Sequence, residues 1–196
     1  MRKITSILLI LVLAISLSAC VYKENNERVN HPKIELASLT EEESSFLRLF
    51  GVDTTSKIFD YVVNEEAKSI NIKQYILDEN LEWKEQGGSS GKIEDLRGRI
   101  AISINDNGDL RIAIQDKNGV AAWSSNHEYL KDIPEHAKAT SWANNSDIIY
   151  NEEIPLAIQI ITSSNEITTY GVESFFDTQR LKGHDKVISV TVTFSN

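Results

Sequence analysis

The chain has little cysteine, little proline and a deficit of basic residues. Its 196 residues include one Cys and three Pro, and 29 acidic residues outnumber 20 basic ones, for a formal net charge of −9. One cysteine excludes an intramolecular disulfide, a CxxC redox pair and a multi-thiolate metal site. The acidic balance argues against a nucleic-acid partner, because phosphate binding needs a basic patch. The length and the 41% of hydrophobic residues indicate a single globular domain.

Motifs for cofactors and metals are also missing. There is no GxGxxG motif or P-loop, so no nucleotide cofactor is expected. The segment from Ser103 to Ile114 differs from a calcium loop at its first and twelfth positions. The four histidines are far apart and show no HxH or HExxH spacing: His31, His127, His136 and His184. We therefore expect neither a cofactor nor a metal site.

The first twenty residues have the pattern of an export signal. Met1-Arg2-Lys3 is basic, the apolar run that follows ends at Leu17, and small residues come next. The run is shorter than the roughly 20 apolar residues that a membrane-spanning helix needs. The tetrapeptide Leu17-Ser18-Ala19-Cys20 resembles the lipobox of bacterial lipoproteins, in which Leu, a small residue and Ala or Gly precede a Cys. The alternative is an ordinary secretory signal with a chance Cys.

The resemblance implies a lipid anchor on Cys20. In bacterial lipoproteins this Cys receives a diacylglyceryl group and the signal peptide is cleaved before it, here between Ala19 and Cys20. The implied location is the cell membrane, on its extracytoplasmic side. Loss of Arg2 and Lys3 with the signal leaves 18 basic against 29 acidic residues, a net charge of −11. We expect a signal peptide at 1–19, the lipidated Cys and a flexible tether at 20–37, and one β-rich domain at 38–196.

A short helix is predicted after the tether. Thr40 followed by Glu43 fits a capping box, and the three glutamates at 41–43 suit the positive end of the helix dipole. Gly51 is a natural end for this helix. The apolar residues expected to share one helical face are Leu39, Phe46, Leu47 and Phe50.

The rest of the chain reads as strands. The clearest region is a three-stranded meander at 99–125, where isoleucines alternate with small or polar residues and Asn107-Gly108 and Asn118-Gly119 separate the runs. Further strands are predicted at 57–63, 70–77, 81–85, 156–160, 167–170 and 188–194, with a helix at 172–181 and an irregular segment at 127–147. We predict a mainly β, antiparallel sandwich-like domain with one or two helices. The alternative is an α+β domain with a helix capping an antiparallel sheet.

Two features are candidate sites. Gly87-Gly88-Ser89-Ser90-Gly91 matches the GxSxG pattern of a hydrolase nucleophile, but lacks the helix that must follow it, so a flexible loop is the preferred interpretation. If pairing keeps its register across Asn118-Gly119, Trp123 lies on the small, polar face of the meander with Arg111, as a stacking platform for a sugar ring. The more conservative interpretation makes Trp123 a core residue.

Two classes of function remain open. The first is a non-catalytic module that binds a glycan or a protein partner in the cell envelope, or acts structurally or as an immunity-type lipoprotein by protein contact alone. The second is an envelope hydrolase whose site forms from distant residues such as Ser89, His127, His136 or His184, with nearby carboxylates. We favour the module, because the sequence contains no credible set of acid, base and nucleophile.

Overall fold

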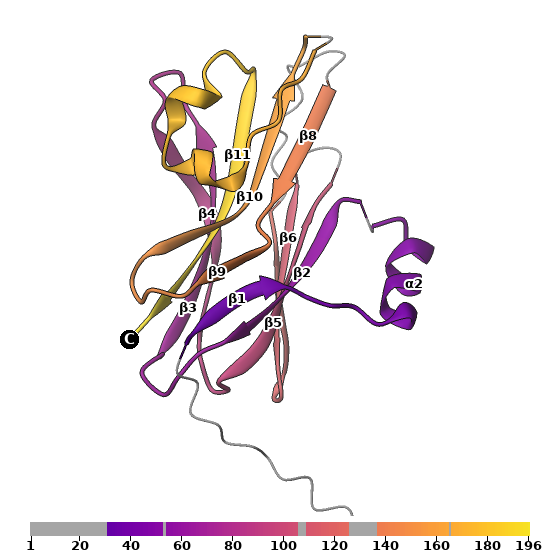
Figure 1. Cartoon of the computed structure of the whole chain (residues 1–196), viewed down its shortest axis with the longest axis vertical. Helices are drawn as coiled ribbons and strands as arrows, with labels where there is room; N and C mark the ends of the chain where they lie inside the picture. Colours follow the sequence, from indigo (N-terminus) through magenta and orange to yellow (C-terminus); the bar gives the residue numbers. More distant parts are fainter. Residues whose placement is uncertain (1–30, 53, 106–108, 126–136, 165) are drawn as a thin grey trace, which may run out of the picture.

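The computed structural model describes residues 31–196, apart from 53, 106–108, 126–136 and 165. The predicted lipobox with Ala19 and Cys20, and the histidines His127 and His136, lie outside the described residues. The described part is mainly β, with two antiparallel sheets packed face to face, one α-helix beside them and two short 3₁₀ helices (Figure 1). The predicted antiparallel sandwich is therefore confirmed.

The two sheets have six and five strands. Sheet A has the order β7 (Gly119–Ser124), β6 (Leu110–Asp116), β5 (Arg97–Ile104), β2 (Ser56–Val62), β1 (Lys33–Leu36) and β9 (Asn145–Asp147). Sheet B has the order β4 (Trp83–Lys92), β3 (Ser69–Leu77), β11 (Lys186–Ser195), β10 (Glu153–Thr162) and β8 (Ala137–Trp142). The helix α2 (Glu41–Leu49) lies between β1 and β2 in the chain, and η2 (Val172–Phe175) and η3 (Thr178–Leu181) precede β11.

The core lies between the sheets and is built from alternating residues. Ile100 and Ile102 of β5 pack with Ile72 of β3 and Val192 of β11 in one buried cluster. Because successive side chains of a strand point to opposite faces, every second residue of these strands enters the core. Each such side chain contributes about 1.5–3 kcal/mol when fully buried. The predicted meander corresponds to β5, β6 and β7, and its alternating isoleucines lie in β5 and β6.

A second, smaller cluster covers the outer face of sheet B. The segment that contains η2 and η3 lies over β3, β10 and β11 (Figure 1). Trp83 stacks on Phe175 at 5.1 Å between ring centroids, and its indole N–H donates to the Phe175 carbonyl at 2.8 Å. The helix predicted at 172–181 is thus two short 3₁₀ turns, and no strand forms in the described part of 167–170.

Three predicted segments differ from the structure. The predicted tether includes β1, where Ile34 is buried and the strand pairs with both β2 and β9. The Gly-Ser run at 87–91 is part of the paired edge strand β4 rather than a flexible loop. The segment predicted as irregular contains β8 and β9. In each case pairing with distant strands supplies the backbone hydrogen bonds that composition does not indicate.

Candidate functional site

The helix α2 starts with the predicted capping box. The Thr40 hydroxyl accepts a hydrogen bond from the Glu43 N–H at 3.2 Å, and the Glu43 carboxylate accepts one from the Thr40 N–H at 2.8 Å. Two backbone donors that the first turn leaves without helical partners are thereby satisfied. The helix ends at Phe50, and Gly51 follows with φ +66°, a conformation that favours glycine.

An ionic contact ties α2 to the outer face of sheet A. Arg99 of β5 donates to Glu43 at 2.6 Å and to Asp60 of β2 at 2.9 Å. Asp60 and Arg99 are directly opposite in the ladder, so the sheet positions the guanidinium for the helix. The pKa of Glu43 lies below its usual value, mainly because of the Thr40 N–H and then because of Arg99. The Glu43 hydrogen bond raises the pKa of Arg99, so both groups remain charged at neutral pH.

A small cavity lies between α2 and the sheet. Its volume is about 260 Å³, and its apolar lining includes Leu39, Leu47 and Ile58. The hydroxyl oxygen of Ser56 is also in this lining and is buried without a hydrogen-bond partner in the described structure. The helix therefore rests on the sheet through a polar contact and a loosely filled apolar space.

The opposite side of α2 is apolar and faces solvent. Phe46, Leu49 and Phe50 are 62%, 77% and 75% exposed, and we call them the α2 ridge. None of the helix residues is buried, and α2 projects from the side of the sandwich (Figure 1). Glu41 and Glu42 are exposed at the start of the same helix. Single exposed apolar residues are common on protein surfaces, whereas these three are adjacent to one another on a projecting helix.

The four residues predicted to share one helical face, Leu39, Phe46, Leu47 and Phe50, have different surroundings in the structure. Leu47 faces the sheet, whereas Phe46 and Phe50 face solvent together with Leu49. At 100° per residue, positions 49, 46, 50 and 47 follow one another around the helix over an arc of about 160°, and Leu47, at one end of this arc, lies on the side of the sheet. The sequence signal for the ridge was the spacing of Phe46, Leu49 and Phe50, whereas the side of the helix that contacts the sheet follows only from the folded structure.

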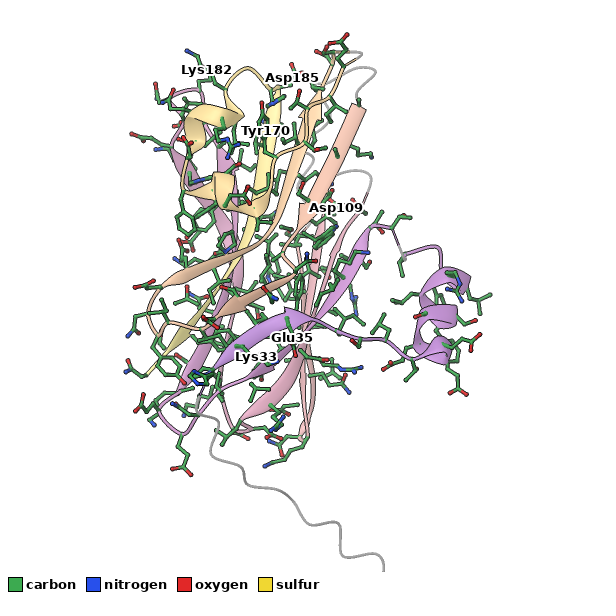
Figure 2. All side chains as sticks on the ribbon, viewed as in Figure 1. Lys33, Glu35, Asp109, Tyr170, Lys182 and Asp185 are labelled. Atoms are coloured by element: carbon green, nitrogen blue, oxygen red, sulfur yellow. The ribbon has the colours of Figure 1, made fainter. Side chains whose placement is uncertain are left out.

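A second hollow lies further along sheet A and is polar. It has a volume of about 510 Å³ and includes Arg97, Arg99 and Lys117 as well as Glu35, Asp60 and Asp116. Glu35 pairs with Lys33 at 2.8 Å on the same strand, where the two side chains lie close together (Figure 2). The hollow is thus lined by three acidic and three basic side chains, with no net charge.

The structure separates Trp123 from Arg111. Trp123 is directly opposite Ile112 in the ladder and packs against the core, with its ring 3.4 Å from the position of a Cβ on Gly87. Arg111 is exposed on the other face of sheet A. The premise of a shared face is wrong because a two-residue hairpin, here Lys117-Asn118, pairs odd-numbered with even-numbered residues. The residues whose side chains face the core therefore have even numbers in β6 and odd numbers in β7.

The other two tryptophans are also partly buried. Trp83 is stacked on Phe175, and Trp142 packs against the main core. A sugar-binding aromatic side chain must present an open ring face, and the three tryptophans each have part of their ring area covered by the protein.

The residues considered for hydrolysis do not assemble in the described structure. Ser89 lies on β4 at the level of Val192 in β11, while His184 precedes the start of β11 at Lys186. Six strand residues separate these levels, roughly 20 Å at 3.3 Å per residue. The ring centroids of His184 and Tyr170 lie 6.1 Å apart. The neighbouring Asp185, labelled in Figure 2, accepts hydrogen bonds from the N–H and the hydroxyl of Ser163, and these bonds lower the pKa of Asp185.

Three remaining features concern metal binding, membrane spanning and similarity to known proteins. Within the described ranges, no group of three or more His, Cys, Asp or Glu side chains is placed to hold a metal ion. The helices in that same part of the chain are all too short or too polar to cross a membrane. Comparison with protein-family models, curated proteins and solved structures finds no match for this chain.

Proposed function

We propose that this protein is an exported lipoprotein, anchored through Cys20 on the extracytoplasmic side of the cell membrane, that acts by binding a protein partner in the envelope. The α2 ridge is the observation that carries the binding part of the proposal. Full burial of an aromatic or leucine side chain is worth about 1.5–3 kcal/mol, so these three side chains can provide the centre of an interface. No catalytic group is assigned.

The chemistry around the ridge specifies the partner. A projecting helix with an apolar stripe suits the groove of another protein, a common mode of helix recognition. Glu41 and Glu42 border the ridge, and the whole chain carries a net charge of −9. We therefore expect an apolar groove with basic residues at its rim, because opposite charges speed association and disfavour wrong partners. A glycan is the less favoured ligand, since the described tryptophans are packed against other groups.

The anchor fits the charge of the domain. One acyl chain holds a protein on a bilayer only marginally, whereas two chains make attachment stable, at about 0.8 kcal/mol per buried CH₂. A chain with a net charge of −11 after cleavage is repelled by an anionic leaflet, so the lipid rather than the protein surface supplies membrane affinity. The domain is then available to partners above the membrane.

The anchor is tested by labelling bacterial cells that express the full chain with a palmitate analogue. The wild type and Ser16→Ala, which changes a signal residue outside the tetrapeptide, should both incorporate label. Cys20→Ala should lose the label and leave the membrane fraction, because the only thiol is gone. Labelling that persists in Cys20→Ala, or a labelled protein that is soluble, would show the lipoprotein assignment to be wrong.

The ridge is tested by photo-crosslinking on intact cells. A photoreactive amino acid replaces Leu49 in one chain and Phe176, which is 69% exposed, in a matched control. We expect a discrete protein adduct only from position 49, and its loss when Phe46→Asp is added. Equal adducts from both positions, no protein adduct, or an adduct only with cell-wall polymer would contradict the proposed protein-binding role.

A further inference from the structure

One edge of sheet A lacks the protection that the other edges have. The edge strands are β7 and β9 in sheet A and β4 and β8 in sheet B. β9 has only three residues, β8 carries Lys138, and β4 carries several charges and a register shift opposite Gln74 and Tyr75. β7 reads Gly-Val-Ala-Ala-Trp-Ser, with no charge, no proline and no register shift. Charges, prolines, bulges and short length are the devices that prevent edge pairing.

The backbone of β7 offers regularly spaced hydrogen-bonding groups. The Ser125 N–H donates to the Leu110 carbonyl at 2.8 Å, so in the alternating antiparallel ladder odd-numbered residues of this strand bond to β6. The N–H and C=O groups of Val120, Ala122 and Ser124 therefore point away from β6. No backbone partner for these groups is found within the described ranges.

We propose that β7 pairs with β7 of a second copy of this chain, antiparallel about a twofold axis at Ala122. Val120 of each copy then faces Ser124 of the other, and the two Ala122 residues face each other. This register joins all three outward N–H and C=O groups of each strand to the other copy. A twofold contact uses one patch on both subunits, so the patch must complement itself, as this sequence does.

The side chains fit this pairing in size and charge. Val120 is 63% exposed, and Ala122 and Ser124 are small and exposed, so no side chain blocks a second strand. The strand contains no ionised group, so two copies with a net charge of −9 meet without acids facing each other. In the next strand, Gln115 lies beside Val120 and Arg111 beside Ser124. The pairing thus places Arg111 of one copy in the same row as neutral Gln115 of the other.

The same geometry explains why the interface is weak and reversible. A six-residue strand buries less than the roughly 1,200–2,000 Å² of a standard stable interface. The dimer is therefore expected to form in the high micromolar range and to dissociate on dilution. A higher ionic strength should strengthen the dimer, because salt screens the repulsion between two acidic domains.

The test is sedimentation equilibrium of the full-length chain in density-matched detergent, over a wide concentration range. The wild type should move from monomer towards twice the monomer mass. Ala122→Pro removes an N–H that points away from β6, and should reduce the dimer fraction at least fivefold without unfolding the sheet. Val120→Lys should do the same, while Ile149→Lys, at a similarly exposed apolar position, should behave as wild type.

Each contrary outcome overturns the proposal. A wild type that stays monomeric up to about 1 mM removes the self-pairing. Dimerisation that survives both Ala122→Pro and Val120→Lys places the contact elsewhere, and equal loss in Ile149→Lys shows that added charge alone is responsible. Circular dichroism of all variants identifies loss of fold, and Val120→Lys, which keeps every backbone donor, carries the test if Ala122→Pro unfolds.

Discussion

The glycine at position 88 provides a direct test of the assignment of β4 as a paired strand. A Cβ added to Gly88 would lie 2.0 Å from the Ile72 carbonyl oxygen in β3, far inside the 3.4–4 Å of an ordinary van der Waals contact. Gly88→Ala must therefore push β4 away from β3 by about 1 Å. Overpacking of this kind costs about 1–3 kcal/mol, and a strained ladder hydrogen bond adds about 1 kcal/mol. At about 2–4 °C per kcal/mol for a chain of this size, Tm should fall by roughly 5–15 °C.

Gly91 of the same strand is the matched control, because nothing lies within 4 Å of its added Cβ. Gly91→Ala should leave Tm unchanged or raise it slightly, since alanine restricts the unfolded chain more than glycine does. Both variants of the segment 22–196 are melted by circular dichroism and unfolded in urea. If 87–91 were a flexible loop, the two substitutions would have the same small effect. A Gly88→Ala protein that melts within 1 °C of wild type would refute the reasoning.

Three further predictions concern single side chains. Glu43→Gln should accelerate hydrogen exchange of the α2 backbone amides, whereas Glu42→Gln should not. In the wild type the pKa of Glu43 is lowered in the folded state. The protection of these amides from exchange should therefore be complete above pH 4.5 and be lost as the pH falls through the lowered pKa of Glu43. Burial raises the pKa of Tyr61 to about 12, so between pH 10 and 12 the Tyr61 hydroxyl ionises mainly in the unfolded chain. Urea unfolding should then show stability falling by up to about 2 kcal/mol across that interval, and Tyr61→Phe should reduce the fall. Trp123→Ala should lower the free energy of unfolding by about 2 kcal/mol, and Arg111→Ala should lower it by less than about 0.5 kcal/mol. Similar losses for the two variants would contradict the placement of Trp123 and Arg111 on opposite faces of sheet A.

The local patterns of the sequence were sufficient for much of the fold. Alternating isoleucines at 100–104 and 110–114 predicted paired strands with one buried face, and that face lies in the core. The Thr40 and Glu43 spacing predicted the capping box that forms. These predictions succeed because the physical cause, a side-chain period or a hydrogen bond three residues away, is contained in a few neighbouring residues.

Contacts between distant residues account for the predictions that failed. Glycine and serine at 87–91 are typical of a loop, but here glycine makes room for the Ile72 carbonyl on one side and for the Trp123 ring near Gly87 on the other. The face of Trp123 depended on the number of residues in one turn, since a two-residue hairpin exchanges odd and even positions. Neither the close approach of β4 to its neighbours nor the turn length is determined by local composition.

The candidate site depends on such distant contacts most of all. The apolar residues of the short helix lie on one arc of about 160°, and its sequence alone does not specify which part of that arc faces the protein. Glu43 decides this by reaching Arg99, a residue 56 positions later in the chain, which brings Leu47 to the sheet and leaves Phe46 and Leu49 in solvent. Reversing the charge at Arg99 should release the helix and remove the fixed presentation of the ridge without altering the core. The orientation of the proposed binding surface is therefore a property of the folded sandwich, whereas the resemblance to a lipobox rests on the four residues 17–20 alone.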